Sequence, residues 1–351
     1  MPRVTIKDIA KHAGVSTATV SYVINETKYV SPQLTDRVQA AIDQLGYHPN
    51  RVARSLRVQN TITIGLVIPD IQNTFFTSLV RAVEDVAYAR EYNVILCNSD
   101  ETINKEALYI DLMLAEQVAG VIISSAHETD NSIHKLIAAR IPVVSVDRRI
   151  SNLDVDTVVI NNVNAAFELV SHLIDDGHHR IGAVVAPPIV TTGRERYQGY
   201  IQALEAHQFP LLPELVHTGL PKEHFGYQAA QALLDLPDPP TALFLGNAYI
   251  ALGALKAIQQ QGLCIPDEIA VVTFDEMEWT SLVQPGLTVV SQPTYELGKV
   301  AAELLFERIA KNDLPTREII LEHTLLIRQS CARHDIKRNS GSVMHAAEIA
   351  S

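Results

Sequence analysis

The sequence predicts a two-lobed α/β core that follows a small all-α module of helix-turn-helix type at the N-terminus. Three observations favour this fold class. Residues 5–25 show the pattern of two short helices around a glycine, residues 62–160 alternate buried-strand runs with helices, and the same alternation begins again after residue 160. With 351 residues, the chain is long enough to bury large cores in more than one domain.

Spacing, capping and turn signals indicate the first two helices. Apolar side chains recur at helical spacing at Ile6, Ile9, Ala10 and Ala13. Thr5 suits the N-cap of this helix, and Gly14 allows a turn that other residues adopt only at a cost. Ser16 can cap the second helix. The inward positions of that helix are Val20, Val23 and Ile24, and its outward side chains are Thr17, Ala18, Ser21 and Tyr22.

The outward face of the second helix carries short or aromatic side chains and no negative charge. A helix with such a face fits the major groove of DNA, where base edges present distinct donors, acceptors and methyl groups. We expect base contacts from Thr17, Ala18 and Tyr22, with Ala18 offering only its methyl group. The alternative is a helical hairpin that only packs against a core. The stretch at residues 45–57 downstream argues against this alternative.

A third helix and a further short segment complete the N-terminal module. Ser31-Pro32 places a capping serine before a proline at the first helical position, and Gly46 ends this helix. Pro49-Asn50 is another helix start, but a single helix that ends near Arg57 is marginal in water. We therefore expect this segment to order only on DNA, paired with the same segment of a second subunit.

These stretches resemble a known family. Ile6–Asn25 is similar to the headpiece of the LacI/GalR family of bacterial transcription regulators, and Leu45–Arg57 is similar to that family's hinge. The resemblance extends to about residue 330 and implies a periplasmic-binding-protein-like core. It also implies that Leu56, with Ala53 beside it, is a wedge pushed into the minor groove at the operator centre. The positions expected to contact DNA are Thr5, Ser16, Thr17, Ala18, Thr19, Ser21, Tyr22, Asn25, Tyr47, Asn50, Ala53, Leu56 and Arg57.

Charge is distributed unevenly along the chain. The whole sequence carries −12, yet residues 1–60 hold eight lysines and arginines against four acids, which gives this part +4 and leaves −16 for the rest. A small basic module on an acidic body is typical of a protein that contacts phosphate with one end only, although a solvated basic face gives the same count. Double-stranded operator DNA is therefore the expected macromolecular partner.

The core is predicted as two rounds of strand–helix alternation with parallel pairing. The first round has strands at 62–69, 94–98, 121–124, 143–147 and 158–160, and helices near 75–91, 106–117 and 131–139. The second has strands at 181–186, 215–218, 242–246 and 269–275, and helices at 165–176, 194–207, 223–234 and 250–261. A helix at 294–311 is expected to return to the first lobe, with crossings between the lobes near 161–163, 289–293 and 321–327.

These patterns divide the chain into five parts. We expect a helix-turn-helix DNA-binding headpiece at 1–46, a hinge helix and linker at 47–60, a first lobe at 61–161 plus 291–322, a second lobe at 162–290 plus 323–331, and a polar tail at 332–351. Because the tail lacks heptads, a coiled coil that builds tetramers is not indicated, and a homodimer is expected.

Polar side chains follow the predicted strands where the two lobes meet. In open α/β sheets, ligands bind beyond the carboxyl ends of the strands, which here carry Asp70, Ser124, Asp147, Asn247 and Asp275. Together with Arg148, Arg149 and Arg196 they suit a polyhydroxylated ligand, because carboxylates accept from hydroxyl groups and arginine donates. By resemblance, the effector-pocket positions are Phe75, Phe76, Asp147, Arg148, Thr192, Arg196, Asn247, Asp275 and Gln292.

Two positions depart from the family's pattern. Asn161 stands where an aspartate is common, and Ala248 stands where the family usually has the aspartate of an Asn-Asp pair. A pocket that loses up to two acids and keeps its arginines favours an acidic or phosphorylated sugar, with an ordinary pentose or hexose equally open. Single residues could instead have a purely structural role, such as an ion pair of Arg196 with its neighbour Glu195 or a helix cap at Asp275.

The remaining features argue against other classes of protein. Cys97, Cys264 and Cys331 are scattered and odd in number, which argues against a disulfide framework and a zinc site and suggests small buried side chains. Gly177-His178-His179 is typical of a helix terminus rather than of a metal site. No cofactor, metal or catalytic residue is expected, because there is no G-x-G-x-x-G after a strand, no Walker loop and no G-x-S-x-G elbow.

The sequence also bears on compartment. No apolar run is long enough to span a bilayer, and Met1–Asp8 has no segment of signal-peptide type, so a cytoplasmic protein without a membrane partner is expected.

Together these features predict a dimeric transcription regulator, by family default a repressor, whose operator affinity is controlled by a small sugar, sugar acid or sugar phosphate. Three alternatives stay open. The same DNA-binding module could respond to a protein corepressor, the core could serve sugar binding and transport, or the fold could carry an enzyme. The N-terminal module argues against transport, and the missing catalytic motifs argue against an enzyme.

Overall fold

The computed structural model describes residues 4–25, 28–47, 61–129, 132–151, 153–311 and 313–331. It separates into two units, Met1–Thr61 and Ile62–Ser351, which are described in turn. Several expected DNA-binding positions lie outside the described residues, namely the side chain of Asn25 and the hinge residues Asn50, Ala53, Leu56 and Arg57. The tail after residue 331 lies outside them as well.

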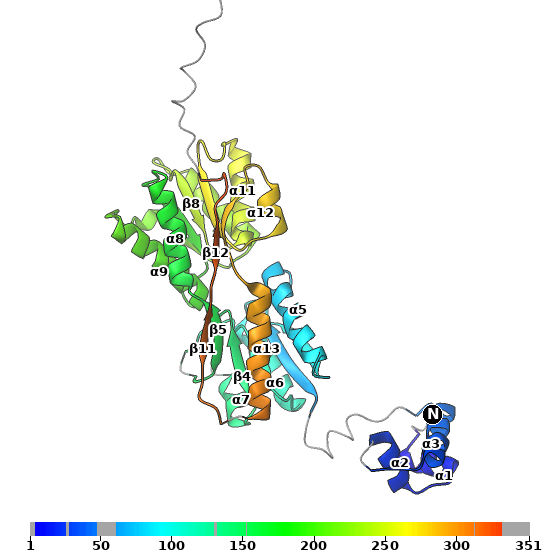
Figure 1. Ribbon diagram of the computed structural model, residues 1–351. Helices are drawn as coiled ribbons and strands as arrows, with labels where there is room; N and C mark the ends of the chain where they lie inside the picture. Colours follow the sequence, from blue (N-terminus) through cyan, green and yellow to red (C-terminus); the bar gives the residue numbers. More distant parts are fainter. Residues whose placement is uncertain are drawn as a thin grey trace, which may run out of the picture. The chain divides into compact units, whose positions relative to one another are not determined.

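The first unit is a bundle of three helices around one small core. The helices are α1 (Ile6–Ala13), α2 (Thr17–Asn25) and α3 (Pro32–Leu45), as the sequence predicts (Figure 1). Ile9, Val20 and Val38, one from each helix, are fully buried at the centre. At Gly14 the chain turns with a φ of 64°, in the left-handed region that glycine adopts at the lowest cost.

The N-cap positions predicted for the three helices are confirmed, with different side-chain contacts at each. Asp8 Oδ2 accepts hydrogen bonds from the backbone N of Thr5 at 2.9 Å and from its Oγ1 at 2.6 Å. Ser16 Oγ accepts from the backbone N of Thr19 at 3.0 Å. Ser31 occupies the N-cap of α3 and Pro32 its first turn, as predicted, although the Ser31 side chain makes no capping hydrogen bond within the described residues.

The second unit consists of two lobes, each built on a six-stranded sheet (Figure 1). The sheet of the first lobe has the order β2-β1-β3-β4-β5-β11, and that of the second lobe has the order β7-β6-β8-β9-β10-β12.

The elements of the first lobe are β1 (Thr63–Ile68), α5 (Thr74–Tyr88), β2 (Asn93–Asn98), α6 (Ile103–Ala115), β3 (Val121–Ile123), α7 (His134–Ala138), β4 (Val143–Val146), β5 (Asp156–Ile160), α13 (Thr294–Ala310) and β11 (Glu318–Leu321). Those of the second are α8 (Asn162–Asp175), β6 (Ile181–Val185), α9 (Thr191–Ala206), η1 (Pro213–Leu215), β7 (Val216–Thr218), α10 (Glu223–Leu234), β8 (Ala242–Leu245), α11 (Ala248–Gln261), β9 (Ala270–Phe274), α12 (Glu278–Leu282), β10 (Thr288–Ser291) and β12 (Thr324–Leu326). The predicted alternation is confirmed, with ends that shift by a few residues; the sequence does not predict α12.

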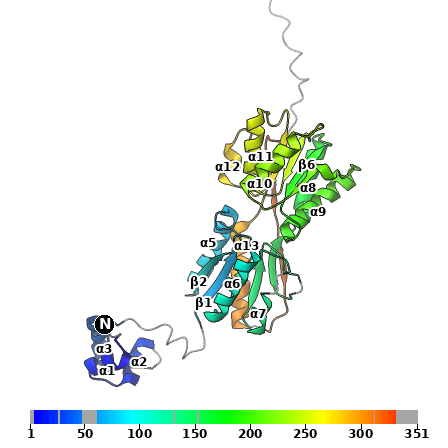
Figure 2. The same cartoon turned by 180° about the vertical axis from the view of Figure 1, so that it is seen from behind.

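Helices cover both faces of each sheet, as the two opposite views show (Figures 1 and 2). In β1, Leu66 belongs to the apolar cluster with α5 and α13, whereas the next residue, Val67, belongs to the cluster with α6 and α7. In β6, Val185 and Val184 divide in the same way between α8 and α9 on one face and α10 and α11 on the other. Because side chains alternate along a strand, burial on both faces explains the continuous apolar runs in the sequence.

Neighbouring strands pair in parallel, as predicted, except for β10 and β12. The chain crosses between the lobes after β5, after β10 and after β11. Strand β11 runs parallel to β5 and therefore leads toward the second lobe, where the chain continues as β12. Strand β12 thus runs away from the first lobe, while β10 runs toward it, so the two must be antiparallel.

Helix α13 returns to the first lobe as predicted and lies beside α5 (Figure 1). The two helices approach closely at Gly298, where a Cβ would lie 2.4 Å from the carbonyl oxygen of Leu79. No helix among the described residues has both the length and the apolar character that crossing a bilayer requires.

The cysteines divide by exposure. Cys97 and Cys331 are buried, whereas Cys264 is exposed. The expectation of small buried side chains is therefore wrong for Cys264, which lies in the turn after α11. Gly177 and His178 end α8 as predicted, with the backbone N of His178 donating to the carbonyl of Leu173 at 3.0 Å.

A buried ion pair fixes the far end of α13 to the first lobe. Arg308 donates from Nε to Asp156 Oδ2 at 2.8 Å and from Nη2 to Oδ1 at 2.9 Å, and Asp156 is 1% exposed. Burial opposes ionisation of Asp156, but the hydrogen bonds from Arg308 and from the backbone N of Arg317 outweigh it and lower the pKa of the carboxyl. The pair therefore stabilises the fold at neutral pH.

We expect Asp156→Ala to lower the free energy of unfolding by about 3–5 kcal/mol, because it leaves the Arg308 guanidinium buried without its counter-charge. Urea denaturation followed by circular dichroism measures this. The matched control is Asp85→Ala, which removes the partner of the exposed Arg81 on α5 and should change stability little. Equal effects of the two substitutions would contradict the assignment.

Candidate functional site

The expected DNA-contacting side chains of the headpiece gather on α2 and its start. Thr17 and Ala18 are exposed, and Ser21 and Tyr22 are half-buried. Ser16 and Thr19 are joined to each other by capping bonds. Thr5 is exposed at the start of α1, and Tyr47 packs against the core of the unit.

Sequence reasoning missed one cation on this part of the headpiece. Lys28 Nζ lies 5.2 Å from the centroid of the Tyr22 ring, within the range of a cation–π contact. An exposed lysine beside the outward face of α2 is suited to a phosphate group next to the bases that the helix would read. Its position three residues beyond the second helix was the available signal.

All nine expected effector-binding residues line one pocket between the two lobes. These are Phe75, Phe76, Asp147, Arg148, Thr192, Arg196, Asn247, Asp275 and Gln292, and each is at most 9% exposed. The lining also includes three charged residues, Asp70, Glu101 and Lys222. Sequence reasoning identifies Asp70 only as a strand end and gives no role to the other two.

Two carboxylates enter the pocket from equivalent places in the two sheets. Asp147 directly follows β4, and Asp275 directly follows β9, the strand in the same position of the other sheet. Both have left-handed backbones, with φ of 67° and 72°. Non-glycine residues seldom adopt this conformation, and it is concentrated at functional sites.

Burial controls the ionisation of these two carboxyls. Burial raises the pKa of Asp147 to about 6, although Arg148 and Arg196 favour its charged form. Burial also raises the pKa of Asp275, against the opposing charge of Arg196 and the hydrogen bond from Gln292 Nε2 at 2.6 Å. Both carboxyls therefore carry a desolvation cost that a ligand with hydroxyl donors can relieve.

The two pocket arginines are held by acceptors from the protein. Arg148 donates from Nη1 and Nη2 to the two carboxylate oxygens of Glu101, at 2.7 Å each. Arg196 donates from Nε to Asn162 Oδ1 at 2.9 Å and from Nη1 to the carbonyl of Gly246 at 2.6 Å. Its guanidinium also lies 4.0 Å from the centroid of the Phe274 ring. Both arginines are therefore rigid donors of fixed orientation.

The suggested pairing of Arg196 with Glu195 is wrong. Glu195 instead forms an ion pair with Nη1 of Arg149 at 2.6 Å. The reason is geometric, because consecutive residues of α9 point in different directions, and only Arg196 faces the pocket. The alternative role of Asp275 as a helix cap holds in part, since Asp275 accepts from the backbone N of Ala248 at the start of α11.

The expectation that Asn161 and Ala248 remove acids from the pocket is also wrong, because neither residue lines it. Asn161 is exposed and caps α8, its Oδ1 accepting from the backbone N of Asn164 at 3.0 Å, so it does not line the pocket. Ala248 does not line it either. Four acids do line it, Asp70, Glu101, Asp147 and Asp275, against the three cations Arg148, Arg196 and Lys222.

Some polar atoms of the lining form no hydrogen bond within the described residues. Gln292 Oε1 and Arg148 Nε are both enclosed in this way, although Arg148 Nε lies 3.6 Å from Asp147 Oδ2, within ion-pair distance. Asn247 Oδ1 caps α11 by accepting from the backbone N of Ile250 at 2.8 Å, which leaves its amide nitrogen as a donor that can face the pocket. Because buried polar groups in native proteins are nearly always bonded, these atoms indicate a polar ligand.

Phe75 and Phe76 supply the apolar part of the lining. Both are at the start of α5, which is capped by Asn73, and their rings meet edge to face with centroids 4.9 Å apart. An aromatic face beside carboxylates and amides is the combination that binds the apolar side of a sugar ring.

Ion pairs join the two lobes on either side of the pocket. On one side, Lys222 Nζ of the second lobe lies 2.5 Å from Asp70 Oδ2 of the first. On the other, Arg194 of α9 pairs with Glu128, and Arg149 pairs with Glu195. The lobes are therefore closed on each other in this structure.

Comparisons with known proteins cover both units. Residues 5–50 match the family model of bacterial regulatory proteins of the lacI family, and residues 61–329 match that of periplasmic binding proteins and the sugar binding domain of the LacI family. The HTH-type transcriptional repressor PurR of Mannheimia succiniciproducens is 36% identical over 327 residues, which are 93% of this chain and 98% of that protein.

Two solved structures are similar over most of the chain. The lac repressor dimer bound to operator and the anti-inducer ONPF has a TM-score of 0.83 at 26% identity, covering 94% of this chain and 99% of that one. The complex of the transcriptional regulator CelR with cellobiose has a TM-score of 0.72 at 31% identity, covering 93% of this chain and 100% of that one.

The two family models together account for the three-helix unit and the two-lobed unit, and the similar proteins are regulators of transcription rather than enzymes. The chain belongs to the LacI family of bacterial regulatory proteins and is a DNA-binding transcription regulator with a helix-turn-helix headpiece and a periplasmic-binding-protein-like core.

Proposed function

We propose that this protein is a homodimeric repressor whose affinity for a near-palindromic operator is set by a small neutral sugar bound between its lobes. The observation that carries the proposal is the pair of buried carboxylates, Asp147 and Asp275, which reach one pocket from equivalent strands of opposite sheets. A ligand with hydroxyl groups on both sides bonds both sheets at once and therefore favours the closed form. The similar CelR structure, described as a cellobiose complex, agrees with a sugar.

The charges of the pocket favour a neutral sugar over a sugar acid or a sugar phosphate. Lys222 and Arg148 are already paired with Asp70 and Glu101, and Arg196 is held by an amide and a carbonyl oxygen. A phosphate would have to displace a carboxylate from its cation and would lie near two further acids. Like charges within a few ångströms in a desolvated site are strongly unfavourable.

On the DNA side, each headpiece reads one half of the operator with Thr17, Ala18 and Tyr22 of α2, and the two 47–60 segments pair at its centre. Ligand binding changes the angle between the lobes and so changes whether these segments can pair. The experiment that tests the whole proposal is a thermal-shift screen of the full chain with neutral sugars, sugar acids and sugar phosphates, followed by operator binding with each hit. A protein-corepressor regulator would respond to none of them.

For the sugar that the screen identifies, we expect Asp147→Asn to lower the affinity about 10- to 100-fold, since a hydrogen bond to a charged group is worth about 1.5–3 kcal/mol. Isothermal titration calorimetry measures this. Asp85→Asn, at a half-buried residue of α5 that does not line the pocket, is the matched control and should bind like the unmodified chain. Unchanged affinity in Asp147→Asn would exclude this carboxylate from the site.

The raised pKa of Asp147 predicts a pH dependence. A sugar hydroxyl donates to the ionised carboxylate, so the affinity should fall as the pH drops through about 6, by up to about tenfold per unit below it. In the chain without sugar, the neutral Asp147 carboxyl contributes to the stability of the fold. This contribution is fully present below its ordinary pKa of 3.8 and is lost as the pH rises through about 6. Calorimetry between pH 5 and 8 tests this, and Asp147→Asn should flatten the profile.

The hinge gives a separate prediction. We expect Leu56→Ala to weaken operator binding at least about tenfold, since the minor-groove wedge is lost, and to leave sugar binding unchanged. Gel retardation with a fragment selected from random DNA measures the first, and calorimetry the second. Leu108→Ala, at an exposed leucine of α6, is the control. Full operator affinity in Leu56→Ala would remove the basis for the hinge assignment.

A further inference from the structure

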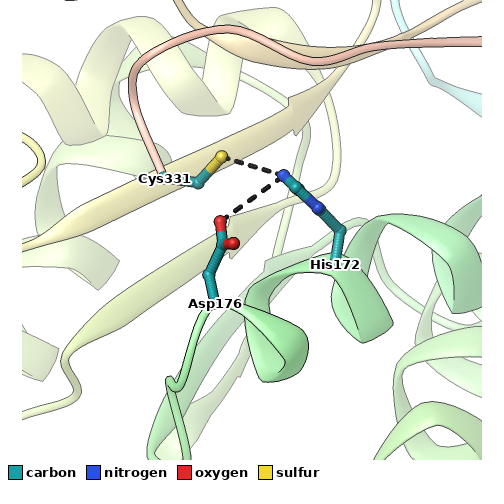
Figure 3. Close-up of side chains that lie close together, drawn as sticks. All are labelled: His172, Asp176 and Cys331. Carbon is teal, nitrogen blue, oxygen red and sulfur yellow. Dashed lines mark hydrogen bonds and ion pairs between the residues drawn. The ribbon is translucent and has the colours of Figure 1, made fainter. Parts of the chain in front are cut away.

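Three side chains of different chemistry meet at the end of the second lobe (Figure 3). Nε2 of His172 lies 3.2 Å from Sγ of Cys331 and 3.5 Å from Oδ2 of Asp176. All three of these atoms are within 4.8 Å of one another. A histidine, a thiol and a carboxylate are the three side-chain types that bind zinc in proteins.

The fold brings these residues together from distant parts of the sequence. His172 lies in the last turn of α8, and Asp176 follows four residues later at its C-cap, so both face the same side. Cys331 belongs to the segment after β12, which is fixed because Ser330 Oγ accepts from the backbone N of Thr288 at 2.9 Å. The cysteine pattern of the sequence argues against a zinc site because no two cysteines are close, but one cysteine is enough when a helix supplies the other ligands.

The distances fit a small tetrahedral ion. Zinc bonds of about 2.0–2.3 Å to nitrogen, oxygen and sulfur place neighbouring ligand atoms about 3.3–3.6 Å apart. The measured separations of 3.2 and 3.5 Å from His172 Nε2 are close to these values. An ion enclosed by the three atoms therefore needs only small side-chain adjustments.

A further observation points to a cation. Asp176 Oδ2 is enclosed, and no described residue outside this cluster donates a hydrogen bond to it, which is unusual for a buried carboxylate oxygen. Zinc binding at Cys331 releases the thiol proton to solvent, and the thiolate and the carboxylate together neutralise the ion.

We propose that His172, Asp176 and Cys331 form a binding site for one zinc-type divalent cation, with water as the fourth ligand. The site is separate from the pocket between the lobes. His172 lies near the C-terminal end of α8, whereas Asn162, about 15 Å away at the start of the helix, accepts a hydrogen bond from the pocket residue Arg196. It joins α8 to the last described segment of the chain. Thr288 Oγ1, 3.0 Å from the sulfur, supports it from β10.

The test uses the full chain stripped of metal with a chelator, in a Cys264→Ser background that removes the exposed thiol. We expect about one zinc per chain by elemental analysis after zinc is added back and the protein desalted, and a melting temperature that rises by several degrees on adding zinc. Cobalt as a probe should give a thiolate charge-transfer band in the near ultraviolet. Asp176→Asn, at a partly exposed side chain that the fold tolerates, should lower the zinc affinity at least about tenfold.

His207→Gln is the matched control, since His207 lies beside Asp175 at 3.9 Å but has no thiol near it within the described residues. It should keep the full zinc response, whereas His172→Gln and Cys331→Ser should lose the cobalt band. Folding of each variant is checked by its circular dichroism and by its melting temperature without metal. Less than stoichiometric zinc in the background protein, or a band that survives Cys331→Ser, would overturn the proposal and leave a hydrogen-bonded cluster.

Discussion

Parallel strands that end at the same cleft are the constraint on which this structure depends. In each lobe the strands lead toward the other lobe, and the chain crosses three times between them. Strand β12 alone runs the other way, because it is the continuation of a crossing. This topology gathers the polar residues at the strand ends in one pocket and limits the lobes to bending at the three crossings. The three crossings beside the pocket therefore form the hinge between the lobes.

Sequence reasoning identified many residues that line this pocket but not which of them form ion pairs or hydrogen bonds with one another. The strand-end rule and the family resemblance placed Asp147, Asp275 and Asn247 correctly around one cavity, because apolar strand runs are read reliably from sequence. The structural alternative that sequence reasoning left open for Arg196, an ion pair with Glu195, is wrong, because the structure pairs Glu195 with Arg149. Which arginine meets which acid depends on helix rotation and side-chain direction, and these are set by tertiary packing rather than by adjacency.

Sequence reasoning also could not distinguish the roles of neighbouring residues at a helix start. Asn161 and Asn162 are neighbours, yet Asn161 is an exposed cap and Asn162 is buried against Arg196. A difference of one position at a helix start exchanges a capping role for a pocket role. The cluster at Cys331 shows the same limit over a longer distance, since His172 and Cys331 are brought together only by the pairing of β12 with β10. The headpiece was more predictable, because its turns and helices depend on local signals at Gly14 and Gly46.

Two of the three ion pairs that join the lobes are partly exposed to water. Lys222 and Arg194, which pair across the cleft with Asp70 and Glu128, are 41% and 42% exposed, whereas Arg149, which pairs with Glu195, is 28% exposed. Exposed pairs contribute at most about 1 kcal/mol each. A ligand that bonds Asp147 and Asp275 together therefore adds its own binding energy to modest contacts in favour of the closed form.

In the proposed mechanism, a shift of this kind reaches DNA through a second subunit. The chain enters the first lobe at β1, whose carboxyl end faces the pocket and whose amino end lies across the sheet from it. The lobe has packed apolar clusters on both faces of that sheet, so it moves as a rigid body and transmits no local distortion along β1. The proposed coupling therefore depends on the proposed dimer, because only two joined chains convert a change in lobe angle into a change in the separation of the two points where the chains enter β1.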